Sequence, residues 1–137
     1  LPDGTTTIVT GALTRPNGVL FSNDYNYLYV AEFTNRILFR WDVDSSGAVS
    51  NQTPLYNALV DGLCSDIVGN LYLASGDRLT VIDKDGNFID EIMSPNGDFM
   101  SNCTIGGPNN QTLYVTSRSR LLSLPIAIPG SQDPGSQ

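Results

Sequence analysis

The sequence is poor in residues that bind soft metals or phosphates. Its 137 residues include no histidine, a single lysine and two cysteines. The lack of histidine excludes imidazole ligation of a metal and the catalytic triads that need a histidine base. With a formal net charge of −7, the chain also lacks the clustered Lys and Arg side chains that hold phosphates. We therefore exclude nucleic acid as a partner and favour a solvated acidic surface or a cation site.

Long apolar runs are also absent. No stretch approaches the roughly 20 apolar residues that a membrane-spanning helix needs, so we expect no membrane partner. Residues 1–4 have neither the basic nor the apolar region of a secretory signal, and we expect a soluble chain from which any signal has been removed. Three Asn-x-Ser/Thr sequons, at Asn51, Asn102 and Asn110, favour a secreted, extracellular protein.

The two cysteines, Cys64 and Cys103, are too few and too far apart for a metal-ligand motif or a disulfide framework. Free cysteine is among the most buried residue types. We expect two buried free thiols, with a disulfide as the alternative.

A repeat of about 40 to 45 residues is the main feature of the sequence, and that period is typical of a four-stranded propeller blade. Three units superimpose, each with a first strand, a polar turn, a second strand rich in β-branched and aromatic residues, and a third strand that opens with Arg. The first strands are residues 16–22, 60–66 and 101–107, the second strands are 27–31, 70–74 and 112–116, and the third strands start at Arg36, Arg78 and Arg120.

A further strand-like segment precedes each first strand, at residues 5–13, 53–59 and 88–93. We interpret these segments as outer strands of the preceding blades, which leaves the last unit without an outer strand after Pro125. The fold class is all-β: a β-propeller of about three four-stranded blades over residues 1–129, followed by a flexible tail at 130–137. Because a closed propeller usually has at least four blades, we expect half of a six-bladed ring. The remaining blades would belong to a longer chain or to a second copy.

Three polar residues stand at the entrances of the first strands: Asn17, Asp61 and Asn102. In a propeller these entrances face the central tunnel, so the three side chains should converge. Their oxygen atoms suit Ca²⁺ or Mg²⁺. The alternative is that Asn and Asp precede Gly here simply because such pairs form turns.

Two acidic segments, residues 42–47 and 83–87, look like fragments of a calcium loop. Neither has the Glu that an EF-hand requires at its twelfth position. Both lie where tight turns between third and outer strands belong, so we interpret them as turns.

Several motifs together resemble the SMP-30/gluconolactonase/luciferin-regenerating family. They comprise residues 15–19 (RPNGV), 28–32 (LYVAE), 35–37 (NRI) and 42–44 (DVD), then 60–63 (VDGL) and 69–72 (GNLY), then 101–107 (SNCTIGG), 112–117 (TLYVTS) and 128–130 (IPG). The similarity covers residues 14 to 130 and corresponds to the C-terminal half of the family's six-bladed propeller.

The resemblance implies a divalent cation in the tunnel, Ca²⁺ first and Mg²⁺, Mn²⁺ or Zn²⁺ as alternatives, and a lactone or similar ester as substrate. It implies that Asn17 and Asp61 are metal ligands and that Asp61 is the catalytic general base. Asn102 would lie near the substrate. If Asn102 lines the tunnel its sequon cannot carry a glycan, which leaves Asn51 and Asn110 as possible N-glycosylation sites.

The resemblance has gaps that keep a second function open. The family's first-blade Glu ligand and second Asn ligand belong to blades that this sequence does not contain, and Val60 replaces the usual Pro before Asp61. The alternative to a metal-dependent lactonase is a noncatalytic extracellular propeller that serves as a binding or structural module. A strictosidine-synthase-like propeller fits the motifs at Asn17 and Asp61 less well.

Overall fold

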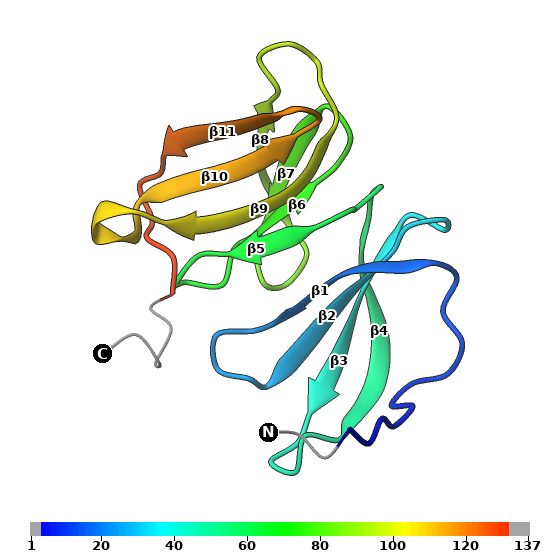
Figure 1. The fold of residues 1–137 in the computed structure, drawn as a ribbon. Helices are drawn as coiled ribbons and strands as arrows, with labels where there is room; N and C mark the ends of the chain where they lie inside the picture. Colours follow the sequence, from blue (N-terminus) through cyan, green and yellow to red (C-terminus); the bar gives the residue numbers. More distant parts are fainter. Residues whose placement is uncertain (1–3, 132–137) are drawn as a thin grey trace.

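The computed structural model describes residues 4–131, and its strands form three antiparallel sheets in series (Figure 1). Within each sheet the strands pair in the order in which they occur in the chain. The first sheet holds β1 (Pro16–Phe21), β2 (Tyr27–Glu32), β3 (Ile37–Val43) and β4 (Val49–Asn57); the second holds β5 (Leu63–Ser65), β6 (Leu71–Ala74), β7 (Arg78–Ile82) and β8 (Phe88–Met93); the third holds β9 (Met100–Gly106), β10 (Thr112–Ser117) and β11 (Arg120–Pro125). A short 3₁₀ turn, η1 (Pro108–Asn110), joins β9 to β10.

These sheets are consecutive blades of a β-propeller, as the repeat predicts. The inner strands β1, β5 and β9 contact one another in sequence across the blades. The third blade has three strands, which confirms that no outer strand follows β11 within the described residues. No helix in residues 4–131 is long and apolar enough to cross a membrane.

The prediction of an outer strand at residues 5–13 is wrong, because this segment forms no strand. A strand needs a neighbour to receive its hydrogen bonds, and the third strand of a preceding blade is not among the described residues. Ile8 and Val9 are exposed. The outer strand β4 begins four residues before the expected residue 53 and ends two before residue 59, whereas β8 has the expected bounds.

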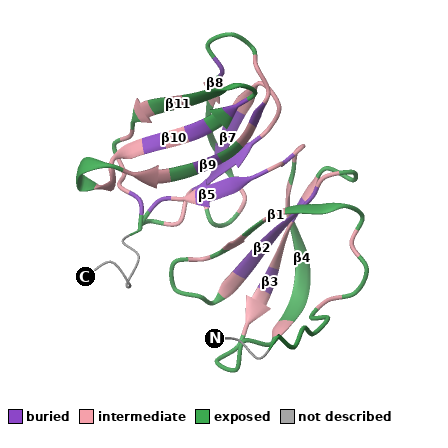
Figure 2. Ribbon diagram, in the orientation of Figure 1, coloured by how far each residue is buried: buried purple, intermediate pink, exposed green. Residues whose placement is uncertain are grey.

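Strands β2, β5 and β7 are mostly buried between blades, whereas the outer strand β4 is largely exposed (Figure 2). Tyr29 and Ala31 of β2 face the second blade, whereas Leu28 and Val30 face the opposite side and pack with Trp41. This alternation with a period of two buries apolar side chains on both faces of a blade. The core between the second and third blades consists of Cys64, Tyr72, Ala74, Leu79, Val81, Met100, Cys103, Leu113 and Val115.

Aspartate-centred turns close the hairpins. Asp44 accepts hydrogen bonds from the backbone N–H groups two and four residues later, at 2.8 and 3.0 Å, and Asp83 does the same at 2.9 and 2.8 Å. These bonds close the turns expected within residues 42–47 and 83–87, although Asp42 and Val43 still belong to β3. Hydrogen bonds from the side chains of Ser46 and Asn87, together with these backbone hydrogen bonds, lower the pKa values of the Asp44 and Asp83 carboxyls.

The C-terminal segment crosses back from the third blade to the second. The Ile67 N–H donates to the Pro129 carbonyl at 2.8 Å, and the Gly130 N–H donates to the Asn110 carbonyl at 2.8 Å. Gly130 is buried against Ile105 and bridges to the second blade, so it is part of the fold and not the first residue of a tail. The rest of the expected tail, from residue 132, lies outside the described residues.

Candidate metal centre

Asn17 and Asp61 lie in direct contact at the entrances of two neighbouring inner strands. Asn17 is the second residue of β1, and Asp61 directly precedes the turn into β5. The Asn17 Nδ2 group donates a hydrogen bond to Asp61 Oδ1 at 2.6 Å, although 44 residues separate them in the chain. Asn17 is exposed and Asp61 is half-buried, so the pair faces solvent at the end of the strands. The expected convergence of these two residues is therefore present.

The glycine after each of these residues permits the close approach of the blades. A Cβ atom on Gly18 would stand 2.6 Å from both the Asp61 carbonyl oxygen and Leu63 Cδ2. A Cβ atom on Gly62 would stand 2.6 Å from Asn102 Cγ and 2.8 Å from the Ser101 carbonyl oxygen. Neither glycine has a positive φ, so it is the space and not the turn conformation that requires glycine here.

Asn102 lies beside this pair but makes no hydrogen bond to it. Its carboxamide packs over Gly62, and its Oδ1 accepts a hydrogen bond from the Cys103 backbone N–H at 2.9 Å. The side chain is exposed on β9. The structure thus brings Asn102 to the backbone that follows Asp61 and leaves it outside the polar contact between Asn17 and Asp61.

The donor chemistry of the Asn17–Asp61 pair fits a hard cation. Asn17 offers a carbonyl oxygen and Asp61 a carboxylate, which are the ligands that Ca²⁺ and Mg²⁺ prefer. The two ends of an Asn carboxamide have almost the same shape, so a half-turn of the group presents its oxygen to the space beside Asp61. No cluster of three or more His, Cys, Asp or Glu side chains occurs within residues 4–131.

Glu32 holds the chain segment that leads into β1, a role that the sequence analysis missed. Its Oε1 accepts a hydrogen bond from the Thr14 backbone N–H, and its Oε2 accepts one from Asn35 Nδ2 at 2.9 Å. The bonds from Thr14 and Asn35 lower the pKa of the Glu32 carboxyl. The signal was present in the repeat, because the residues that align with Glu32 in the other units are Ser75 and Ser117, and only Glu32 carries a charge.

A hollow of about 590 Å³ lies at the opposite ends of the inner strands. Leu20, Phe21, Tyr25 and Ile105 are among the residues that line it. Its lining also includes polar residues such as Ser22, Asn23 and Ser65 but no carboxylate, so we place the candidate chemistry at the strand entrances.

The sequons differ in accessibility. Asn51 is exposed on the outer strand β4, where its φ is +52° and its Nδ2 donates to Asp42 Oδ2 at 2.9 Å. Asn110 is half-buried in the η1 turn, where its carbonyl accepts the hydrogen bond from Gly130.

Comparison with known proteins identifies the family of this chain. The family model described as the SMP-30/Gluconolactonase/LRE-like region matches residues 1–119. The chain is 29% identical over 129 residues to a gluconolactonase from Zymomonas mobilis subsp. mobilis, covering 85% of this chain and 36% of that protein. It is 31% identical over 123 residues to pentonolactonase XacC from Haloferax volcanii, covering 84% and 42%.

A solved structure of a gluconolactonase from Xanthomonas campestris superimposes with a TM-score of 0.80 at 31% identity, covering 91% of this chain and 42% of that one. The chain therefore spans less than half the length of these relatives. Because the family match covers residues 1–119, more than half of the chain, the chain belongs to the SMP-30/gluconolactonase/LRE-like family.

Proposed function

We propose that this chain forms part of a divalent-metal-dependent hydrolase that opens a lactone or a similar ester. The observation that carries the proposal is the contact between Asn17 and Asp61 at the converging entrances of two inner strands. The relatives named gluconolactonase and pentonolactonase support a sugar lactone as the substrate class.

Asn17 and Asp61 would hold the cation through their side-chain oxygens. Ca²⁺ is the first choice, ahead of Mg²⁺, Mn²⁺ and Zn²⁺, because both ligands are oxygens and the chain has no histidine. A bound cation would supply Lewis acidity, which polarises the lactone carbonyl and favours ionisation of water.

Asp61 is the proposed general base. Its Oδ1 accepts the hydrogen bond from Asn17, and the part of the chain that the structure describes places no donor on Oδ2. Asp61 takes a proton from the water molecule as the water oxygen adds to the carbonyl carbon. When the ring C–O bond breaks, the same proton passes to the leaving oxygen, and the product is a hydroxy acid.

The remaining tunnel wall must come from elsewhere. We propose further propeller blades, in a longer chain or in a second copy, as the partner of these three blades. Asn102 would then lie near the substrate, because its carboxamide sits over the backbone that follows Asp61. Native mass spectrometry of the purified chain distinguishes a dimer from a monomer.

Asp61→Asn tests the proposal, with Asp90→Asn as the matched control. Both variants remove one negative charge, but Asp90 lies exposed on the outer strand β8. We expect Asp61→Asn to weaken Ca²⁺ binding at least about tenfold by calorimetry, because a charged ligand becomes neutral, and to abolish hydrolysis of a gluconolactone in a pH-stat assay. Unchanged Ca²⁺ affinity in Asp61→Asn would refute the assignment.

A noncatalytic propeller is the second candidate. The hydrogen bond between Asn17 and Asp61 favours it, because the two side chains satisfy each other without a cation. This function predicts no Ca²⁺ binding and no lactone hydrolysis by the wild-type chain, with the fold unchanged.

We also propose that the protein is secreted and carries N-linked glycans. The exposed position of Asn51 on the outer strand supports a glycan there more strongly than the half-buried position of Asn110 does.

A further inference from the structure

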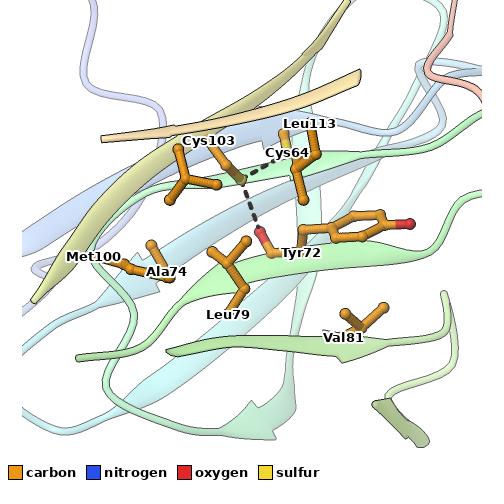
Figure 3. Close-up of a cluster of buried hydrophobic side chains, with 9 residues drawn as sticks. Cys64, Tyr72, Ala74, Leu79, Val81, Met100, Cys103 and Leu113 are labelled. Carbon is orange, nitrogen blue, oxygen red and sulfur yellow. Dashed lines mark hydrogen bonds between the residues drawn. The ribbon is translucent and has the colours of Figure 1, made fainter. Parts of the chain in front are cut away.

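The two cysteines of the chain meet inside the core between the second and third blades. Cys64 lies in the middle of β5, and Cys103 lies in the middle of β9. Their Sγ atoms are 2.6 Å apart, and both residues are buried, at 7% and 9% exposed. Figure 3 shows the two side chains directed at each other among apolar neighbours.

The positions of the two cysteines on β5 and β9 bring their thiols together. Along β5, Leu63 faces the first blade and Cys64 faces the third. On β9, Cys103 packs into the same core as Cys64, and its thiol also donates to the Tyr72 carbonyl at 3.3 Å. The approach of the two strands is close because Gly62, two residues before Cys64, has no side chain. Two free thiols in adjacent strands are therefore held side by side, a few residues from Asp61 and Asn102.

We propose that Cys64 and Cys103 are a modification site: they form a disulfide that joins the inner strands of two blades when the chain folds in the presence of a small disulfide oxidant. The structure describes the reduced form, in which both cysteines are free. One cysteine thiolate attacks the small disulfide, which forms a mixed disulfide and releases one thiol. The second cysteine then attacks the protein sulfur of the mixed disulfide and releases the second thiol. Two cysteine thiols lose two electrons and two protons, and the small disulfide is reduced to two thiols.

The bond would brace the wall that carries the candidate site. Cys64 is three residues after Asp61, and Cys103 directly follows Asn102. A covalent link between β5 and β9 therefore limits how far the Asp61 and Asn102 backbones can separate. This role does not depend on the reaction that the site performs.

Bond formation should accompany folding and not follow it. The hydrogen bond to Cys103 and burial raise the pKa of the Cys64 thiol. A thiol with a raised pKa contains little of the reactive thiolate, and a buried one excludes a reagent as large as glutathione. The reduced, folded chain should thus resist oxidation, whereas the unfolded chain should not.

The test is to refold the reduced, unfolded chain in a mixture of oxidised and reduced glutathione, quench with acid, unfold, alkylate free thiols and measure the mass. We expect no alkylated cysteine, a mass lower by two hydrogen atoms, and a Cys64–Cys103 cross-linked peptide after proteolysis. The already folded, reduced chain should react at least about tenfold more slowly. A refolded chain that carries two alkylated thiols, or that forms covalent dimers instead, overturns the proposal.

A second measurement separates the bond from effects of mutation. The urea midpoint of the wild-type chain should be higher after oxidative refolding than in the presence of a reductant. The variant with both Cys64→Ala and Cys103→Ala should show the same midpoint under both conditions. An equal midpoint for oxidised and reduced wild type contradicts a bracing bond, whatever the stability of the variant.

Discussion

Gly62→Ala gives the sharpest prediction about how the blades meet. The new Cβ atom would stand 2.6 Å from Asn102 Cγ and 2.8 Å from the Ser101 carbonyl oxygen. The Asn102 side chain can rotate away, but the Ser101 carbonyl belongs to the backbone of β9. To reach ordinary contact, the segment that enters β5 and the strand β9 must separate by several tenths of an ångström.

Overpacking of this kind costs about 1–3 kcal/mol. With a urea dependence of about 2 kcal/mol per molar, the unfolding midpoint should fall by roughly 0.5–1.5 M. Ca²⁺ binding should weaken as well, because the backbone shift moves Asp61, the neighbour of the altered residue. Urea unfolding followed by tryptophan fluorescence at Trp41, together with calorimetry of Ca²⁺ binding, measures both effects.

Gly106→Ala is the matched control, since no atom beyond its chain neighbours lies within 4 Å of its new Cβ and its φ is not positive. It should change the free energy of unfolding by no more than about 1 kcal/mol. If Gly62→Ala unfolds at the wild-type urea concentration, or if Gly106→Ala is equally destabilising, the close approach of the blades is not what requires glycine.

Three further predictions test other contacts. The folded-state pKa of Glu32 is lowered, so its contribution to stability is complete above roughly pH 4.3 and is lost as the pH falls through the folded pKa. Glu32→Gln should therefore be less stable than the wild type at pH 7 and lose less stability on acidification, as measured by urea midpoints between pH 7 and pH 3. Parallel pH profiles of the two proteins would contradict this. Asp66 is fully buried and accepts a hydrogen bond from Tyr72 in addition to those of its turn. Asp66→Ala should therefore lower the free energy of unfolding by at least about 3 kcal/mol, clearly more than Asp83→Ala in the same kind of turn. Equal losses of unfolding free energy in urea would argue against the effect of burial. Expression in a eukaryotic secretory pathway should place a glycan on Asn51 that Asn51→Gln removes, and a wild-type mass equal to the bare chain would exclude it.

The sequence alone determined the fold class, because its signals are local. Strand alternation has a period of two, the turns depend on Asp, Asn and Gly at fixed offsets, and the repeat sets the blade length. Asp44 and Asp83 could be interpreted as turn residues for the same reason, since each turn is closed by hydrogen bonds within five residues. The convergence of Asn17 and Asp61 also followed from the sequence, because equivalent positions in successive blades lie side by side.

Tertiary structure decided everything that depends on contacts between blades. Residues 5–13 have a strand-like pattern but form no strand, since pairing depends on a neighbour and not on propensity. Gly130 looked like the start of a tail and instead bridges two blades, a contact that no local pattern encodes. The meeting of Cys64 and Cys103 depends on how closely β5 approaches β9, and this approach is possible because Gly62 has no side chain to collide with Asn102. These distances arise only when whole blades pack together.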